Sequence, residues 1–386
     1  MISDQQHLEL LRAEAMLLQA VAARTLGQRY RLLWQVWRIV RDRHTPLIVG
    51  NRVYFLFWGA ARSVAVVGDW TGWRAPETLH RIPGTNFFVL MKLLPETACV
   101  QYKLIVDGRW DLDPQNPRYS LEGFGVNSEL VMPHFAVPEI VSVREITGDI
   151  PETVVRHRFQ STILGEEREI FFYLLQRSRE PVRILLFHDG EESLTIGGYH
   201  LILERLFQQR DVPSMLAVFL PPKRRNEEYE ANPRFLQFCA EEVPEQIAAW
   251  CEREGVAVAN RRMLTIGASL AGLVATLLTI YYPDHYGGFI AQSPAYWWMF
   301  SALWNAPELA NLRRAVGVLQ TGTIADARVQ TQLFFFRFRQ YTHRIAYQET
   351  HQGHTWGQWR RMLAPGFLRW LELERGRRDS NPRPLV

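Results

Sequence analysis

The chain has 386 residues, of which 47% are hydrophobic and 22% charged, so it is long enough for two buried cores and has an ordinary globular composition. Its net charge of +4 is mild, and the sequence has neither zinc-finger spacing nor an RNA-binding aromatic motif, which argues against a nucleic-acid partner. No run approaches about 18 uninterrupted apolar residues, so no membrane span is expected.

The cysteines and the N-terminus bear on the compartment. Three cysteines, widely spaced and without a CxxC pair, argue against a disulfide framework. The first residues lack a positive segment followed by an apolar run, so no secretory signal is expected. These features predict reduced thiols in a cytoplasmic protein.

Residues 1–46 are predicted to form a helical extension. Leucines recur at helical spacing up to Leu18, and after a break near Gly27 a second apolar run with interleaved arginines spans residues 29–43. This pattern favours helices docked on the protein's own body, and it also occurs in helices that lie on a membrane or bind a partner.

Residues 47–135 have the pattern of a small all-β domain. Short strand-like runs at 52–57, 63–67, 87–93 and 99–106 are separated by turn residues. Such regular strands without helices predict an immunoglobulin-like β-sandwich. The stretch 136–152 is predicted to be a linker.

Residues 153–374 alternate strands with longer helical segments. Strand-like runs at 169–175, 182–187 and 214–219 are separated by helical patterns, and the run 182–187 is almost continuously apolar. This is typical of an α/β domain whose mostly parallel sheet is covered by helices on both faces. The basic, proline-containing tail 375–386 is predicted to be disordered.

A candidate nucleophile lies where an apolar strand turns into a helix. The sequence Gly267-Ala-Ser269-Leu-Ala271 has the form G-x-S-x-G of a nucleophile elbow, with alanine at its last position. The sharp turn needs small neighbours, and alanine is still small. Ser269 is therefore the predicted nucleophile, and a structural serine in a strand-to-helix turn is the alternative.

A histidine and an acid are expected downstream of this serine. His354 is the best base because it lies on a glycine-bounded loop just past a strand-like run, and His351 is the alternative. Asp326 follows an apolar run and a turn, where it can accept the Nδ1–H of His354. Glu349 is the runner-up; the remaining carboxylates between the serine and the histidine are Asp284 and Glu308.

The developing oxyanion of an acyl transfer needs two backbone N–H donors. One is predicted to be the amide of Leu270, directly after the serine. The other is predicted to be the amide of Glu191, because Gly190 lets the backbone turn inward at the end of a buried strand.

Five ordered motifs resemble the enterochelin-esterase-like hydrolases, which are serine esterases with an α/β-hydrolase fold. The motifs are LFHDGE (186–191), RNEEYEAN (225–232), IGASLAG (266–272), QSPAYWW (292–298) and GHTWGQWR (353–360). The resemblance covers about residues 165–375 and implies a Ser–His–acid hydrolase, with Ser269, His354 and Asp326 as the matching residues. This sequence departs from the family pattern at Ala271 and at Thr355, where aspartate is frequent.

The same resemblance suggests the residues that face the substrate. Arg225 matches a family position that is structural or substrate-facing, and Tyr296, Trp297 and Trp298 are predicted to line the cleft. The run 223–225 would suit an anionic or catecholate group, although a solvated charge run also explains it.

The predicted sandwich resembles glycogen-binding and isoamylase N-terminal modules. The matching segments are VVGDWTGW (66–73), QYKLIVDGRWDLDP (101–114) and GVN (125–127). In sugar-binding members two tryptophans, a lysine and an asparagine hold the glucan, and the matching positions are Trp73, Lys103, Trp110 and Asn127. Many modules of this kind in multidomain enzymes, however, only pack against the catalytic domain.

Together these patterns predict a serine carboxylic-ester hydrolase that needs no metal and no cofactor. Its substrate is predicted to be a small-molecule ester or an oligosaccharide ester. The alternatives are a carbohydrate esterase whose sandwich holds a polysaccharide, and a glucan-binding scaffold without activity.

Overall fold

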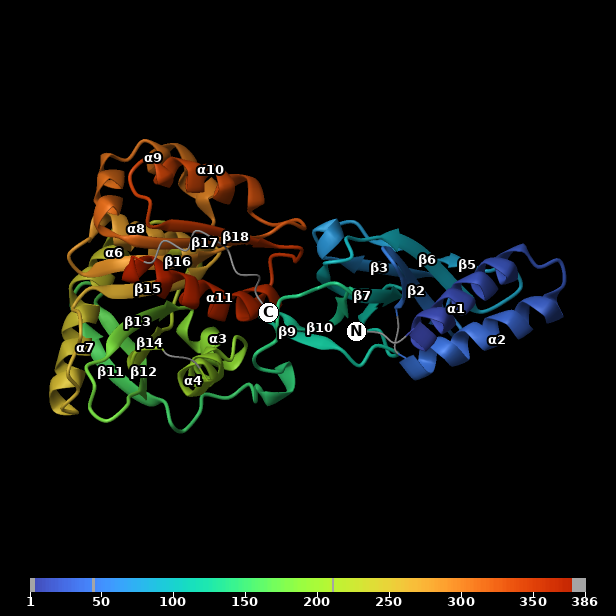
Figure 1. Ribbon diagram of the computed structural model, residues 1–386, viewed down its shortest axis with the longest axis horizontal. Coiled ribbons are helices and arrows are strands. Elements are labelled where there is room, and N and C mark those ends of the chain that lie inside the picture. The colour runs from blue at the N-terminus through green and yellow to red at the C-terminus, as the bar shows by residue number, and fades with distance from the viewer. Residues whose placement is uncertain (1–3, 44–45, 210–211, 377–386) are drawn as a thin grey trace. The chain divides into compact units, whose positions relative to one another are not determined.

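The computed structural model describes residues 4–43, 46–209 and 212–376 (Figure 1). The predicted disordered tail lies outside the described residues, apart from Arg375 and Gly376 at the end of the last helix. The described residues form two compact units: one contains those up to Ala136 together with the segment Thr350–Gly353, and the other contains those of Val137–Glu349 and from His354 to Gly376.

The first unit begins with two helices, α1 (Asp4–Ala22) and α2 (Leu26–Arg43), which pack on a four-stranded sheet. The strand order is β1-β2-β6-β5, and the strands are β1 (Leu47–Val49), β2 (Arg52–Trp58), β5 (His80–Arg81) and β6 (Phe87–Leu93). Apolar side chains of the helices, among them Ala13, Leu17, Leu33 and Val36, form one core with Tyr54, Leu56 and Phe87 of the sheet. The helical extension is therefore docked on its own unit, as its sequence pattern predicts.

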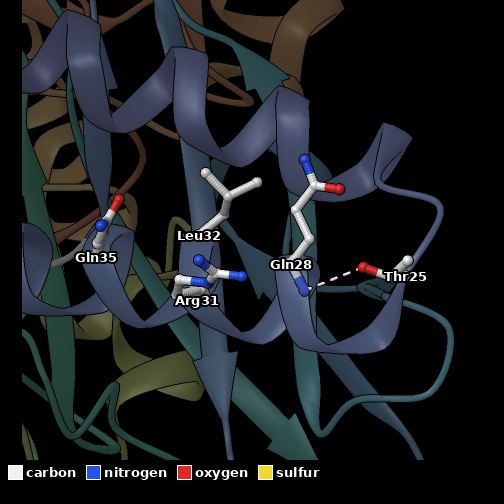
Figure 2. Close-up of a pocket in the computed structure, with 5 residues that line it drawn as sticks. All are labelled: Thr25, Gln28, Arg31, Leu32 and Gln35. Atoms are coloured by element: carbon white, nitrogen blue, oxygen red, sulfur yellow. Dashed lines mark hydrogen bonds between the residues drawn. The ribbon is translucent and has the colours of Figure 1, made fainter.

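One ion pair fixes α1 to the sheet. The Arg52 guanidinium donates to both carboxylate oxygens of Glu14 at 2.6 and 2.8 Å, and the Tyr54 hydroxyl donates to the same carboxylate at 2.5 Å. The hydrogen bond from Arg52 outweighs burial and lowers the pKa of Glu14. A hollow of about 360 Å³ lies along α2. Its lining residues, labelled in Figure 2, are Thr25, Gln28, Arg31, Leu32 and Gln35, and none of them belongs to the predicted site.

The second sheet of this unit completes an antiparallel sandwich. Its order is β4-β3-β7-β10-β9, with β8 paired to β7; the strands are β3 (Val64–Gly68), β4 (Glu77–Thr78), β7 (Cys99–Val106), β8 (Arg109–Asp111), β9 (Tyr119–Glu122) and β10 (Gly125–Val131), and the short helix η1 (Asp69–Thr71) follows β3. Phe55 from the first sheet stacks on Trp70 and meets the edge of Tyr102 from the second. The all-β character expected from the short alternating runs is thus confirmed.

The second unit is built on an eight-stranded sheet of order β11-β12-β14-β13-β15-β16-β17-β18. The strands are β11 (Val155–Ser161), β12 (Glu166–Leu175), β13 (Arg183–His188), β14 (Met215–Leu220), β15 (Met263–Ala268), β16 (Tyr286–Gln292), β17 (Val316–Gly322) and β18 (Ile345–Thr350). The strands from β14 to β17 are parallel, and β11 and β12 run antiparallel at one edge. The apolar run at 182–187 is indeed a central parallel strand.

Helices cover both faces of this sheet (Figure 1). On one face lie α3 (Gly190–Thr195), α4 (Tyr199–Gln209) and α11 (Trp356–Arg375). The opposite face carries the large apolar core, to which α6 (Pro233–Ala240), α7 (Glu242–Arg253), α8 (Leu270–Tyr281) and α10 (Arg328–Arg339) contribute. Short elements complete the unit: η2 (Val143–Glu145), α5 (Arg225–Tyr229), η3 (Tyr296–Met299), α9 (Phe300–Trp304) and η4 (Pro307–Arg314).

The predicted linker packs within the second unit, since Glu145 pairs with Arg205 at 2.6 Å and Ile146 lies against Gly198.

Within the part of the chain that the structure describes, no helix is long and apolar enough to cross a membrane.

A buried ion pair anchors the antiparallel edge of the sheet. Arg168 on β12 is 1% exposed and donates to both oxygens of Glu228 on α5, at 2.8 and 3.0 Å. The same carboxylate accepts the backbone N–H groups of Lys223 and Arg224. Because both charges are out of water, removing one leaves the other without compensation.

We therefore expect Arg168→Met to lower the free energy of unfolding by about 3–5 kcal/mol, measured by urea denaturation. Arg158→Met is the matched control on the neighbouring strand, because Arg158 is 58% exposed and contacts Glu169 at 3.5 Å. It should cost less than about 1 kcal/mol. Equal losses in the two variants would contradict the argument.

Candidate active site

Ser269 lies in the tight turn between β15 and α8. Its backbone has φ 57° and ψ −122°, a conformation that L-residues rarely adopt. The turn is held by hydrogen bonds from the Ser269 N–H to the Gln292 carbonyl at 2.9 Å and from the Ala295 N–H to the Ser269 carbonyl at 2.9 Å. The serine side chain is thereby presented at the carboxyl end of the parallel strands.

Small residues around the turn are required by its geometry. A Cβ on Gly267 would lie 2.4 Å from the Ala271 carbonyl oxygen and 2.8 Å from its methyl group, and a Cβ on Gly272 would meet the Gly267 oxygen at 3.1 Å. The methyl group of Ala271 is fully buried and lies against Gly267. The elbow thus accepts alanine at its last position because Gly267 has no side chain.

His354 and Asp326 meet Ser269 in one line of hydrogen bonds. The Nε2 atom of His354 lies 3.0 Å from the Ser269 hydroxyl oxygen, and its Nδ1 atom lies 2.6 Å from Asp326 Oδ1. His354 lies two residues before the start of α11, and Asp326 lies in the loop between β17 and α10. The structure therefore brings together the three residues chosen from the sequence. Because an ionised carboxylate can only accept, the imidazole proton lies on Nδ1, and Nε2 is left to accept from the Ser269 hydroxyl.

Asp326 is held as an anion. Its side chain is fully buried, which opposes ionisation, but the hydrogen bonds from His354, from the Ser293 hydroxyl at 2.7 Å and from the Ala327 N–H at 2.7 Å outweigh burial and lower its pKa. The Gly322 N–H also donates to Asp326 Oδ2. An ionised carboxylate with this many donors has a fixed direction toward the imidazole.

The alternative residues are engaged elsewhere. His351 belongs to the first unit, where its ring contacts the Thr97 hydroxyl and its carbonyl accepts the Cys99 N–H at 2.9 Å. Glu349 accepts from Arg328 at 3.1 Å and from the Tyr347 hydroxyl at 2.7 Å. Neither contact leads to Ser269.

The predicted oxyanion donors lie at two helix N-termini. Leu270 is the first residue of α8 and Glu191 the second of α3, so both N–H groups belong to first turns, in which no carbonyl of the same helix accepts them. Asp189 begins α3 with φ 51° and binds Arg225 through two hydrogen bonds of 2.7 and 2.8 Å. Arg225, predicted to face substrate, therefore also fixes the turn that carries Glu191.

The three predicted cleft aromatics differ in exposure. Trp297 and Trp298 are 47% and 51% exposed, and the Trp297 ring lies 6.4 Å from the ring of His354. Tyr296 is fully buried, with its hydroxyl 2.8 Å from that of Thr276 and its ring against Phe334. The apolar ring of Tyr296 fills the core beneath η3, so this residue lies under the exposed tryptophans and does not line a surface.

Three of the four sandwich residues, Lys103, Trp110 and Asn127, lie on adjacent strands of the second sheet. Lys103 and Asn127 lie on neighbouring strands, and Trp110 pairs with Ile105, which is on the same face of β7 as Lys103. Trp110 is 48% exposed. The Asn127 amide donates to Gln101 at 2.9 Å, and the Trp73 indole donates to Asp69 at 2.9 Å.

Sequence reasoning missed a group of polar residues behind Asp326. Ser293, Gln358 and Trp359 meet there, and all three are buried. They fall inside the QSPAYWW and GHTWGQWR motifs, so the signal was present, but no periodicity or motif rule links two segments so far apart in the chain. Within the described ranges, no three His, Cys, Asp or Glu side chains gather closely enough to hold a metal ion.

The comparisons with known proteins agree with this architecture. An enterobactin esterase from Salmonella typhimurium has a similar structure, with a TM-score of 0.69 and 19% identity over 83% of this chain and 93% of that one. The Shigella flexneri enterobactin esterase, solved in the presence of enterobactin, gives a TM-score of 0.68 and 18% identity over 84% and 93%. No curated protein matches the sequence.

The fold and the elbow define an α/β-hydrolase-type carboxylic-ester hydrolase preceded by a β-sandwich. The family model described as "Putative esterase" matches residues 161–370, and the chain belongs to this family. Residues 52–130 match a second model, described as "Glycogen recognition site of AMP-activated protein kinase".

The elbow geometry makes a direct prediction about stability. Gly267→Ala places a methyl group against the Ala271 backbone at 2.4 Å, so we expect it to cost at least about 1–3 kcal/mol of unfolding free energy. Gly287→Ala is the control, because its Cβ meets Arg262 Cβ at 3.2 Å and no backbone atom closer than 3.5 Å. Thermal unfolding of both variants tests this, and an unchanged Tm in Gly267→Ala would show that the turn relaxes freely.

Proposed function

We propose that the protein hydrolyses a carboxylic ester by two-step acyl transfer through Ser269, with His354 as general base and Asp326 as its orienting acid. The observation that carries this proposal is the line of hydrogen bonds from Ser269 Oγ to His354 at 3.0 Å and from His354 to Asp326 at 2.6 Å. Family membership supports the reaction class, and the strained turn supports the choice of nucleophile.

In the first step His354 takes the Ser269 proton while Oγ attacks the ester carbonyl. The imidazolium that forms lies beside the ionised Asp326, which stabilises it without accepting the proton. The resulting tetrahedral oxyanion is bound by the N–H groups of Leu270 and Glu191. His354 then protonates the leaving alcohol. In the second step His354 takes a proton from water, which attacks the acyl group, and His354 returns the proton to Ser269 as the acid leaves.

The substrate we propose is a bulky ester with aromatic or ring-shaped parts. The exposed ring of Trp297 beside His354 and the exposed ring of the adjacent Trp298 support this, because flat apolar faces bind such groups well. The similarity to esterases whose structures are titled as enterobactin esterases agrees with a siderophore-like or catecholate ester. Arg225 would contribute through its half-exposed guanidinium.

The organisation of the chain belongs to the same proposal. We assign a helical extension to 1–46, a sandwich to 47–135, a linker to 136–152 and an esterase domain to 153–374; the change of unit after Ala136 supports the second boundary. A cytoplasmic location is supported by the three buried cysteines, all within the described residues, which no disulfide joins.

A second candidate function is α-glucan binding by the sandwich, which would make the protein a carbohydrate esterase. The match to a glycogen-recognition model and the exposed ring of Trp110 near Lys103 support it. Aromatic faces stack on the C–H faces of sugar rings, and the lysine can bind a hydroxyl group.

The first test is intact mass after treatment with a fluorophosphonate probe. Wild type should gain one adduct, and Ser269→Ala should gain none and lose about 10⁴-fold or more in kcat on p-nitrophenyl acetate. Asp326→Asn should lose about 10³- to 10⁴-fold, because the imidazole is left in the wrong tautomer.

The control is Ser178→Ala, since Ser178 also has a positive φ, 40°, but precedes β13 and so lies at the opposite edge of the sheet. It should retain both labelling and turnover. A folded wild type that takes up no probe would refute Ser269 as an activated nucleophile.

The second function is tested by retention on immobilised glycogen. If the sandwich binds glucan, Trp110→Ala should weaken retention about two- to tenfold, since aromatic stacking is worth roughly 0.5–1.5 kcal/mol. Trp34→Ala is the control, because Trp34 is 54% exposed in the same unit but lies on α2. Wild type that passes through the column unretained would remove this candidate.

A further inference from the structure

Ser293 lies directly behind the acid of the proposed triad. It follows β16, is fully buried, and has a backbone φ of 45°. Its hydroxyl oxygen lies 2.7 Å from Asp326 Oδ2, 3.0 Å from Gln358 Oε1 and 3.1 Å from Trp359 Nε1. A polar side chain so placed in a strained turn calls for a reason beyond packing.

The hydrogen-bonding capacity of the hydroxyl determines where its proton goes. A serine hydroxyl has one proton and two acceptor lone pairs, and the Trp359 indole N–H, which can only donate, takes one lone pair. The Gln358 oxygen is the atom placed 3.0 Å from Ser293, while the Gln358 nitrogen has no partner within the described part of the chain. Turning this amide by 180° exchanges the two atoms, so that the nitrogen gains a partner and fills the second lone pair of the hydroxyl. The proton of Ser293 is then left for Asp326, which as a carboxylate can only accept.

A network of buried amides holds Ser293 in this place. Its backbone N–H donates to the Gln320 carbonyl at 2.7 Å. The neighbouring Gln292 side chain donates to the Gln320 side chain at 2.9 Å and to the Trp359 carbonyl at 2.9 Å. The Gln320 side chain continues to Gln348 at 2.8 Å. A ladder of three glutamines therefore crosses β16, β17 and β18 beneath the site.

The same ladder reaches the helix that follows His354. Gln320 donates to the Met362 carbonyl of α11 at 2.7 Å, and a Cβ on Gly366 would lie 2.5 Å from the Gln320 nitrogen. Trp359 on α11 packs the edge of its ring on the imidazole of His354, with 5.1 Å between centroids. Ser293 is thus linked to His354 in two ways: it is hydrogen-bonded to Asp326 and to Trp359, and each of these residues contacts the imidazole.

We propose that Ser293 is a positioning residue for the ester hydrolysis, which directs Asp326 and Trp359 so that the His354 imidazole faces Ser269. This inference rests on the function proposed above. Without the hydroxyl, Asp326 Oδ2 keeps the Gly322 N–H, but the carboxylate loses a buried donor and Trp359 loses its acceptor. The imidazole is then less well held on both sides.

The experiment compares Ser293→Gly with Ser293→Ala. Both remove the hydroxyl, but glycine adopts a positive φ without strain, whereas alanine keeps the strain. We expect kcat on p-nitrophenyl acetate and the rate of fluorophosphonate labelling to fall about 10- to 100-fold in both variants, with KM little changed. The Tm of Ser293→Gly should equal or exceed that of Ser293→Ala.

A spectroscopic readout separates positioning from folding. Wild type should show a downfield proton resonance from His354 Nδ1–H, and this resonance should broaden or move in both variants. Ser178→Gly, at a positive φ on the opposite edge of the sheet, should leave this resonance and kcat unchanged.

The outcomes distinguish the two proposals. Wild type that is not labelled by the probe refutes the proposed triad itself. Labelling of Ser269 at the wild-type rate in a folded Ser293→Gly variant, with an unchanged Nδ1–H resonance, leaves the triad in place and overturns the role of Ser293. Loss of activity in Ser293→Ala alone, with Ser293→Gly fully active, would assign the effect to backbone strain and would also overturn it.

Discussion

The strained backbone at the carboxyl edge of the parallel sheet is the constraint on which the second unit depends. Asp189 after β13, Ser269 after β15 and Ser293 after β16 all have positive φ, and Ala325 joins them in the loop after β17. Each such residue costs on the order of 1–3 kcal/mol, so it persists only where its surroundings hold it. Four neighbouring strands are thus followed by strained residues at the same edge of the sheet. This is the edge at which Ser269, His354 and Asp326, the residues of the proposed triad, converge.

The surroundings that hold these turns are polar and buried. Asp189 is held by the guanidinium of Arg225, and Ser293 by Trp359 and Gln358. Ser269 is held by backbone bonds to Gln292 and Ala295. Because an unpaired polar group in the interior is expensive, each of these networks has little freedom to rearrange. The rigidity that the proposed acyl transfer requires is therefore supplied by hydrogen bonds across strands as well as by the apolar core.

Two histidines at this edge show how the environment separates a structural imidazole from the proposed base. His188 is fully buried next to Thr265, and burial lowers its pKa to about 3, so it stays neutral and cannot serve as a base near neutral pH. His354 is partly open to solvent and contacts an ionised carboxylate. An imidazole that takes up a proton becomes positively charged, and only a partner such as this carboxylate keeps the free-energy cost of that charge small.

Much of this arrangement could be predicted from the sequence, because the signals are local. The elbow is a five-residue pattern, and the acid could be chosen among a few carboxylates because chain order restricts it. Side-chain depth could not be read in the same way: Tyr296 and Trp297 are adjacent aromatics, yet one fills the core under η3 and the other is exposed beside His354. The glutamine ladder was also hidden, since its members are about 28 residues apart and meet only when three strands pair.

The sandwich illustrates why a matching residue set does not determine a binding site. The amide of Asn127 is bonded to Gln101 and the indole of Trp73 to Asp69, so two of the four groups that would hold a sugar are already satisfied within the unit. A ligand that recruits them must first replace those bonds, which removes most of the net gain. The exposed ring of Trp110 has no such competition. Any affinity of this face for glucan should therefore come mainly from stacking, which is tolerant of sugar identity, and less from hydroxyl recognition.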